Sequence, residues 1–399
     1  MKYVIVLADG MADEPLEQLG GKTPMEVAKT PVMDALAKHG QVGMVNTVPN
    51  GMKPGSDVAN LSVMGYNPAE CYSGRSPLEA LSVGVAMEPT DVIFRCNIVT
   101  VSEEEPYDQK TILDHSSGEI STEDADILMD AIRDAFNNEE FSFFTGTSYR
   151  HITVWKNGEV LDFEPPHDHL GQVIAEFLPV DPKFRAMMEK SFDILNNHPL
   201  NVKRATEGKN KANSLWFWGA GTKPALQNFK EKTGLTGTMI SAVDLLKGIA
   251  VGAGMQVVNV PGATGSLDTN YEGKAQAALD ALLKDGNDFV YIHVEGPDEM
   301  GHQGELEHKI QAIANIDERI LAAVKAGLDA AGEDYRILVL PDHPTPIRCR
   351  THTSDPVPFV LYDSTVAFDQ GCGFTEAEAK KSGIVLEHGY ELIRKLIGG

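Results

Sequence analysis

Cysteine and positive charge are both scarce in this chain of 399 residues. The four cysteines, Cys71, Cys96, Cys349 and Cys372, lie far apart and include no CxxC pair. That spacing is typical of reduced thiols in the cytoplasm and argues against a disulfide framework. Lysine and arginine total 34 against 58 acidic residues, for a formal charge of −24. Because nucleic acids and anionic membranes are bound through clustered cations, this balance argues against both as partners.

Long apolar segments are absent too, since no stretch approaches the roughly 20 apolar residues that cross a bilayer. The first residues, MKYVIVLADG, begin like a signal peptide, but the apolar run before Asp9 is only six residues long. A run this short predicts a buried strand and not a secretory segment. We therefore expect a soluble, cytoplasmic protein; the sequence gives no indication of its oligomeric state.

The common nucleotide-binding and hydrolase motifs are missing as well. GGKTP at 20–24 resembles the end of a phosphate-binding loop, but Leu16 occupies the place of the first glycine in GxxxxGK[ST]. No GxGxxG follows a strand pattern, and neither HExxH nor the GxSxG elbow occurs. No motif therefore supports a P-loop ATP site or a serine-hydrolase triad.

Continuous apolar runs recur along the chain and alternate with amphipathic helical patterns. The runs cover 3–8, 256–260, 288–294, 336–341 and 357–362. Apolar runs without polar alternation indicate strands that are covered on both faces. Between them, 268–286 and 305–332 place apolar side chains at helical spacing. Strands that alternate with helices predict an α/β fold with a mainly parallel sheet flanked by helices.

The middle of the chain has a different pattern. It contains a strand-like run at 91–101, a helical pattern at 122–138, further strand-like runs after 140, and the breakers EPPHDH and LPVDP. We interpret this part as a smaller α+β domain, residues 89–179, inserted into a larger discontinuous domain of residues 1–88 and 180–399.

Side chains of the kinds that bind metals follow several of the apolar runs. They are Asp9, Asp298, His302, Asp342, His343 and His352. The carboxyl ends of parallel strands form the binding crevice of open α/β sheets, so these residues and Ser56 are expected to converge there. Such a ligand set matches two divalent cations. Each residue alone has an ordinary alternative, such as a turn at Asp9, and only the joint placement supports a metal site. His293, inside a strand, is expected to be a buried, hydrogen-bonded histidine and not a ligand.

Ser56 stands in the stretch PGSDVANLSVMGYNP, at the head of a predicted short helix. It could be an ordinary helix cap or a nucleophile. The local sequence fits both interpretations. Asp57 is expected to be a first-turn acid and not a base.

Seven stretches together carry a resemblance to a known family. They are ADGMAD, GGKTPMEVAKTPVMDALAKHG, PGSDVANLSVMGYNP, GRSPLEA, VPGATGSLDTNYEGKA, HVEGPDEMGH, and PDHPTP with THTSDPVPF. This pattern resembles the cofactor-independent phosphoglycerate mutases of archaeal type, members of the alkaline phosphatase superfamily, and it covers nearly the whole chain. The resemblance implies an alkaline-phosphatase-like fold. It also implies a metal-dependent isomerase of glycolysis that interconverts 3-phosphoglycerate and 2-phosphoglycerate.

The resemblance also implies roles for individual residues. Ser56 is then the nucleophile that becomes phosphoserine. We expect it to cap its helix as well, because the amide groups and dipole at a helix N-terminus favour the negative charge of a phosphoryl group. Asp9, Ser56, Asp342 and His343 would hold one metal ion, and Asp298, His302 and His352 the other. The insertion would be the phosphotransferase domain that grips the substrate, with His115 and Arg150 as its main candidates. The weaker candidates Arg75, Lys203, Arg204, Lys209 and Lys211 are expected to be surface charges. Carboxylate and imidazole ligands suit Mn²⁺, with Zn²⁺ and Mg²⁺ as alternatives.

Other functions fit parts of the same pattern. A related branch carries a proposed homoserine kinase activity, which would use the same metals and serine with a phosphoryl donor. A phosphatase ranks third, because an inserted domain favours transfer over hydrolysis. A non-catalytic binding protein is least favoured, because such a protein would be expected to have lost some of these ligands.

Overall fold

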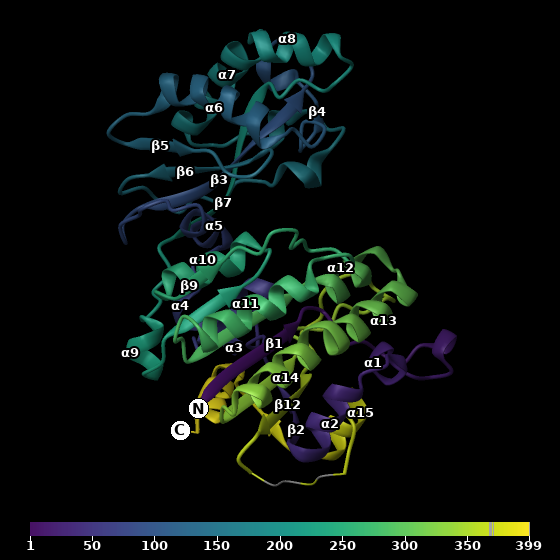
Figure 1. Cartoon of the computed structure of the whole chain (residues 1–399). Coiled ribbons are helices and arrows are strands. Elements are labelled where there is room, and N and C mark those ends of the chain that lie inside the picture. Colours follow the sequence, from purple (N-terminus) through teal and green to yellow (C-terminus); the bar gives the residue numbers. More distant parts are fainter. Residues whose placement is uncertain (367–368, 370, 399) are drawn as a thin grey trace. The chain divides into compact units, whose positions relative to one another are not determined.

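The computed structural model describes residues 1–366, 369 and 371–398. The chain forms two compact units, coloured along the sequence in Figure 1. Unit 1 combines Met1–Tyr72 with Ala225–Gly399, and unit 2 is the continuous segment Ser73–Pro224. Each unit has its own sheet and its own apolar core.

Unit 1 is built on an eight-stranded sheet with the strand order β13-β2-β12-β11-β1-β10-β8-β9. The strands are β1 (Lys2–Ala8), β2 (Gln41–Val45), β8 (Gly237–Ile240), β9 (Gln256–Val258), β10 (Phe289–Val294), β11 (Tyr335–Leu340), β12 (Val357–Asp363) and β13 (Val385–Leu386). β1 pairs in parallel with β10 and β11, which confirms the predicted mainly parallel sheet. β12 is an exception, because it runs antiparallel to both β11 and β2.

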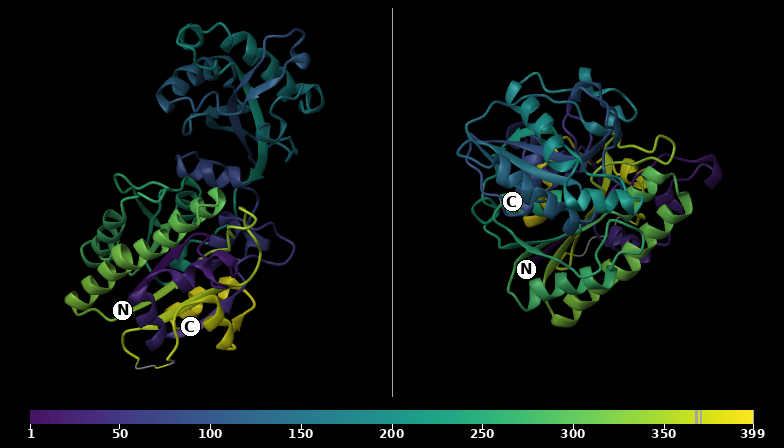
Figure 2. Two further views of the ribbon diagram at one scale, coloured as in Figure 1. Left: turned by 90° about the vertical axis from the view of Figure 1, so that its right-hand side faces the viewer. Right: turned by 90° about the horizontal axis from the view of Figure 1, so that it is seen from above.

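Helices cover both faces of this sheet (Figures 1 and 2). They are α1 (Pro24–Val27), α2 (Pro31–His39), α3 (Ser56–Val63), α4 (Pro68–Cys71), α9 (Phe229–Thr233), α10 (Asp244–Gly252), α11 (Tyr271–Leu283), α12 (Gly296–Gln303), α13 (Leu306–Asn315), α14 (Ala322–Ala331), α15 (Glu376–Lys381) and α16 (Leu392–Ile397). A π-helical segment (Ile316–Leu321) joins α13 to α14. Val4, Ile5, Val6 and Leu7 are all fully buried, although successive strand residues face opposite sides. Burial on both faces explains why β1 is an uninterrupted apolar run.

Unit 2 contains a five-stranded antiparallel sheet around the long strand β3. Its elements are α5 (Arg75–Ser82), β3 (Val92–Val101), β4 (Ile112–Asp114), α6 (Thr122–Phe136), β5 (Phe141–Phe144), β6 (Arg150–Trp155), α7 (Pro182–Leu195), α8 (Pro199–Thr206) and β7 (Ser214–Thr222). α6 and α7 pack their apolar faces on the sheet, with Leu128, Ile132 and Phe184 in the core. This is the α+β composition that the sequence predicts for the inserted part.

The limits of unit 2 are wider than the predicted insertion of 89–179. The difference has a physical reason, because β7 pairs along most of β3 and α7 packs against β7. The chain therefore completes this sheet only after residue 214. α5 likewise packs on β3 and β7 and belongs with them. These contacts join segments far apart in sequence, which apolar patterns alone do not reveal.

Candidate active site

Strand register places the first site residues side by side. β1 and β11 pair in parallel, and their last registered pair is Leu7 with Leu340. Asp9 and Asp342 each follow two residues later, so the parallel register brings both carboxylates to the same edge of the sheet. The amide of Gly10 donates a hydrogen bond of 3.2 Å to Asp342 Oδ1 and links the two loops.

Asp9, Asp342 and His343 form one buried group of possible metal ligands. Their ligand atoms lie within 4.8 Å of one another. Nε2 of His343 lies 3.4 Å from Asp342 Oδ2 and 3.6 Å from Asp9 Oδ1. Ser56 joins this group, because its Oγ lies 3.2 Å from His343 Nε2 and 3.5 Å from Asp9 Oδ2. The structure thus brings together the four residues predicted for the first metal.

The expectation that Ser56 caps its helix is wrong. Ser56 is the first residue of α3, the capping position belongs to Gly55, and no side chain caps this end. The Ser56 hydroxyl contacts His343 and Asp9 and is not engaged with the helix amides. Asp57 is a first-turn acid as expected, and its carboxylate accepts hydrogen bonds from the Val58 amide and the Tyr72 hydroxyl.

A second group consists of Asp298, His302 and His352. Asp298 and His302 are four residues apart on α12 and therefore share one face of the helix. Asp298 Oδ2 lies 3.3 Å from His302 Nε2, and Asp298 Oδ1 lies 3.3 Å from His352 Nε2. The ligand atoms of Asp298, His343 and His352 are also within 4.8 Å of one another. His343 is therefore close to both groups, whereas the family resemblance implied that it belongs to the first alone.

The electrostatics of these groups fit a cation. Burial, with the nearby carboxylates of Asp342 and Asp298, raises the pKa of Asp9 well above its ordinary value. Burial also opposes ionisation of Asp298, but its hydrogen bonds with His302 and His352 hold its pKa well below the ordinary value. Oδ1 of Asp9 is buried and has no hydrogen-bond partner among the described residues. Converging carboxylate oxygens and imidazole nitrogens are the donor set of divalent metal ions.

Two supporting residues, Asn60 and Tyr291, escaped the sequence analysis. The Asn60 amide group donates to the Ser56 carbonyl at 2.8 Å and to Asp342 Oδ2 at 2.9 Å, and its oxygen accepts from the Tyr291 hydroxyl at 2.6 Å. Asn60 lies one helical turn after Ser56, and this spacing was the one signal that could have identified it. His293 is buried and hydrogen-bonded as predicted, with Nε2 3.0 Å from Asp9 Oδ2. Burial lowers the pKa of His293 to about 3, so the imidazole beside Asp9 is neutral.

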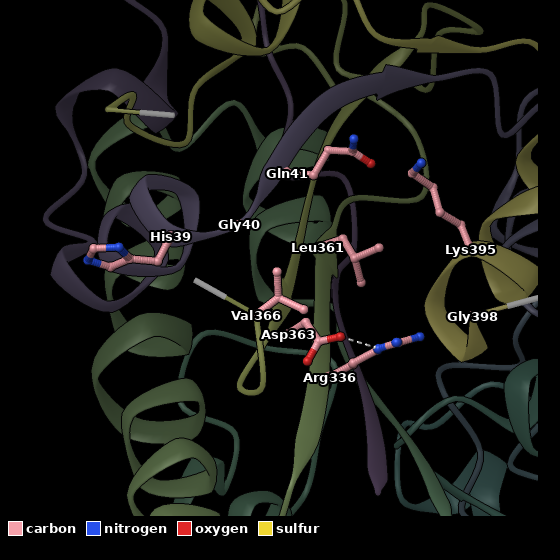
Figure 3. A pocket seen from close by; sticks show the side chains of 9 residues that line it. All are labelled: His39, Gly40, Gln41, Arg336, Leu361, Asp363, Val366, Lys395 and Gly398. Carbon is pink, nitrogen blue, oxygen red and sulfur yellow. Dashed lines mark hydrogen bonds and ion pairs between the residues drawn. The ribbon is translucent and has the colours of Figure 1, made fainter. Parts of the chain in front are cut away.

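A pocket of about 310 Å³ in unit 1 lies elsewhere (Figure 3). Two of its lining residues, Gln41 and Arg336, lie at or near the first residues of β2 and β11. Asp342 follows the last residue of β11, so the pocket lies at the opposite edge of the sheet from the candidate site. Arg336 is already bound there, because its Nε donates to Asp363 Oδ2 at 2.6 Å. None of the predicted site residues lines this pocket.

Comparison with known proteins decides the family. The sequence model of the family 2,3-bisphosphoglycerate-independent phosphoglycerate mutase matches residues 37–201. A protein of Geobacter sulfurreducens, named probable 2,3-bisphosphoglycerate-independent phosphoglycerate mutase, is 49% identical, with 100% of both chains covered. A mutase of the same name from Methanosarcina barkeri is 48% identical over 100% of this chain and 99% of its own length. The chain belongs to the 2,3-bisphosphoglycerate-independent phosphoglycerate mutase family.

The solved structure of a named mutase agrees with this family membership, and a second solved structure shares the fold. The cofactor-independent phosphoglycerate mutase of Thermoplasma acidophilum is 28% identical with a TM-score of 0.69, covering 100% of this chain and 99% of that one. The PH0037 protein of Pyrococcus horikoshii is 29% identical with a TM-score of 0.82, and the match covers 100% of this chain and 97% of that one. The resemblance seen in the sequence is thereby confirmed. As a member of this mutase family, the chain is a metal-dependent enzyme of the isomerase class.

The structure also places the remaining candidates. His115 and Arg150 of unit 2 both lie near the ring of Tyr149. The centroids of the His115 and Tyr149 rings are 5.6 Å apart, and the guanidinium carbon of Arg150 lies 5.2 Å from the Tyr149 centroid. Nδ1 of His115 is buried without a hydrogen-bond partner among the described residues. Arg150 is exposed.

The weaker cationic candidates are engaged with acids. Arg75 pairs with Glu79, Lys203 and Lys209 with Glu207, and Lys211 with Glu103. Arg204 is not the surface charge that we expected. It is buried and bound to Asp124 and to the carbonyls of Ser117 and Asn210, because it holds the end of α8 against its neighbours.

In the described part of the chain, no helix combines the length and apolarity that crossing a membrane requires.

Proposed function

We propose that this mutase-family chain interconverts 3-phosphoglycerate and 2-phosphoglycerate through a phosphoserine on Ser56. The observation that carries the proposal is the position of the Ser56 hydroxyl. Its Oγ lies at the start of α3 and within 3.5 Å of both Asp9 Oδ2 and His343 Nε2, inside a group of buried acids and imidazoles. Phosphoryl transfer depends mainly on positioning and charge neutralisation. The start of α3 positions the hydroxyl, and the surrounding carboxylates and imidazoles would neutralise phosphoryl charge by holding divalent cations.

Two divalent ions complete the proposed site. We assign one to Asp9, Ser56, Asp342 and His343, and the other to Asp298, His302 and His352. We favour Mn²⁺, with Zn²⁺ and Mg²⁺ as alternatives, because oxygen and imidazole ligands suit these ions. When bound, they would neutralise phosphoryl charge and favour the ionised serine hydroxyl.

The proposed reaction consists of two balanced transfers. Ser56 Oγ attacks the phosphorus of 3-phosphoglycerate in line, so that the Oγ–P bond forms and the bond from phosphorus to the 3-oxygen breaks. The proton lost by Ser56 balances the proton gained by the leaving alkoxide. The 2-hydroxyl of the retained glycerate then attacks phosphoserine, so that the bond from phosphorus to the 2-oxygen forms and the Oγ–P bond breaks. The proton lost by the 2-hydroxyl balances the proton that Ser56 Oγ regains, which yields 2-phosphoglycerate and restores Ser56. We assign the grip on glycerate to His115 and Arg150 of unit 2, because the positive charge of Arg150 and the unpartnered ring nitrogen of His115 suit a carboxylate and hydroxyls.

The mutase names of the relatives favour this reaction over the homoserine kinase alternative. We also propose a cytoplasmic location for the enzyme, on the basis of the widely spaced cysteines in its sequence.

The test couples the Mn²⁺-loaded protein to enolase with 3-phosphoglycerate and no bisphosphoglycerate. Turnover in the wild type should fall at least about a thousandfold in Ser56→Ala, because the nucleophile is removed. Ser62→Ala is the matched control, since this serine lies on the same helix and its buried hydroxyl has no hydrogen-bond partner among the described residues. No turnover by a folded, metal-loaded wild type would overturn the proposal, and so would full activity in Ser56→Ala.

A further inference from the structure

Thr345 lies between the two groups of metal-binding residues, although it belongs to neither. Its side chain is fully buried. Its hydroxyl donates a hydrogen bond to Oδ1 of Asp298, and the same oxygen lies 3.3 Å from Nδ1 of His343. One hydroxyl therefore contacts one ligand from each proposed metal position.

These two contacts determine where the hydrogens lie. An ionised carboxylate only accepts hydrogen bonds, and a threonine hydroxyl carries a single hydrogen. That hydrogen goes to Asp298, so the hydroxyl oxygen offers a lone pair to His343, and Nδ1 of His343 must carry its hydrogen. Nε2 of His343 then keeps its lone pair. This atom faces Ser56 Oγ at 3.2 Å and Asp342 Oδ2 at 3.4 Å, where the first metal is proposed.

We propose that Thr345 is a positioning residue that sets the tautomer of His343 and the orientation of Asp298 and so couples the two metal positions. The inference rests on the metal site of the proposed function. A hydrogen bond to the second nitrogen of a ligating histidine fixes which nitrogen is free for the metal, and such partners strongly affect metal affinity.

The backbone around Thr345 holds this hydroxyl in place. The buried ammonium of Lys309 donates to the Thr345 carbonyl at 2.8 Å, and the Thr345 amide donates to the Ala12 carbonyl at 3.3 Å. Two glycines leave room for it, because a Cβ at Gly301 would lie 2.5 Å from the Thr345 carbonyl oxygen and a Cβ at Gly10 would lie 2.6 Å from Thr345 Oγ1. Thr345 thus contacts the loop that follows Asp9 and the helix α12 that carries Asp298 and His302, and its side chain has little freedom to turn away.

The first test measures Mn²⁺ binding by calorimetry in the wild type and three variants. Thr345→Val keeps the shape but removes the hydroxyl, and should weaken binding about 10- to 100-fold. Thr345→Ser restores the hydroxyl and should recover most of the affinity. Thr353→Val is the matched control, because the Thr353 hydroxyl is buried without a hydrogen-bond partner among the described residues. Wild-type affinity in a folded Thr345→Val protein would overturn the proposal.

The second test needs no variant at residue 345. NMR of metal-free, ¹⁵N-histidine-labelled wild type should show the hydrogen of His343 on Nδ1, with the signal assigned by its loss in His343→Gln. The opposite tautomer would overturn the proposal even if Thr345→Val failed to fold. If the wild type bound no Mn²⁺, the proposed metal site would be wrong. The tautomer measurement alone would then test whether Thr345 sets the tautomer of His343.

Discussion

Nε2 of His302 lies 2.9 Å from Nε2 of His352. Two imidazole lone pairs repel each other at this distance unless a proton or a cation lies between the nitrogens. The hydrogen bond with Asp298 raises the pKa of His302 to about 8, so in the metal-free protein near neutral pH a proton on His302 supplies that attraction. A divalent cation bound by both rings would take its place.

Removal of one of these rings should therefore reduce metal binding. We expect His302→Ala to lower the amount of Mn²⁺ retained after dialysis by about half, since one of two proposed positions loses a ligand. Metal analysis by mass spectrometry measures this. His308→Ala is the control, because His308 is exposed on α13 and contacts Glu305. Equal metal content in the two variants would exclude His302 from the ligand set.

Much of this site could be predicted because the sequence pattern indicates where the buried strands end. An apolar run that ends in Asp9 or is followed by Asp342-His343 marks where a strand leaves the core, and parallel pairing brings such ends together. Thr345 and Asn60 were missed because their roles depend on neighbours that are remote in sequence. Asp298 is 47 residues from Thr345, and Asp342 is 282 residues from Asn60.

The fold was predictable for the same reason, and within the same limits. Strands β2 and β8 are buried but were not predicted, because each is short and contains a glycine, Gly43 or Gly237. β12, like β1, β10 and β11, appears as an apolar run. Its antiparallel direction does not appear in that run, since direction depends on the path of the chain between strands. Unit 2 extends further than predicted because β7 pairs with β3, more than 110 residues earlier in the chain, and no local pattern reports such pairing.

Metal binding should stabilise unit 1 alone. The three tryptophans, Trp155, Trp216 and Trp218, all lie in unit 2, whereas every proposed metal ligand lies in unit 1. For each of the two proposed ions, Mn²⁺ at a hundred times the dissociation constant should stabilise unit 1 by about 2.7 kcal/mol. Urea unfolding of EDTA-treated and Mn²⁺-loaded protein should show this gain in the circular-dichroism transition of unit 1 and no change in the tryptophan transition. A joint shift of both signals would show that the two units unfold as one.

The buried pair of Lys309 and Asp13 should be costly to break. Lys309 Nζ lies 2.8 Å from Asp13 Oδ2, and both side chains are fully buried. Lys309→Met leaves an unpaired buried carboxylate and should cost about 3–5 kcal/mol of unfolding free energy. The double variant Lys309→Met with Asp13→Asn should lose less than the sum of the two single variants, because the unpaired charge is gone. Urea titrations measure these values, and additive losses would contradict the expectation.

An exposed pair provides the control for that experiment. Lys284 lies 2.7 Å from Asp280, four residues earlier in the sequence, and its side chain is 69% exposed. Lys284→Met should cost less than about 1 kcal/mol, because solvent screens an ion pair at the surface. A cost similar to that of Lys309→Met would mean that the charge alone, and not its burial, determines the loss.

Asp317 should make the stability of the protein depend on pH. Its carboxylate accepts hydrogen bonds from the amides of Met33 and Val32, at 2.7 and 3.1 Å, at the start of α2. These bonds lower the pKa of Asp317, but burial has the larger effect and raises it from 3.8 to about 6. Between these two values, the folded protein binds a proton that the unfolded chain has lost. Raising the pH through this window therefore destabilises the folded state through Asp317.

The difference in unfolding free energy between wild type and Asp317→Asn isolates this contribution. Asparagine does not ionise, so the wild type should lose stability relative to the variant as the pH rises from about 4 to about 6, and the difference should level off above that window. Urea unfolding at half-unit pH steps measures it, and Asp334→Asn, at an exposed position, controls for the loss of one negative charge. A difference that stays constant, or that grows in favour of the wild type as the pH rises, would mean that the amides at the start of α2 outweigh burial and that Asp317 is ionised throughout.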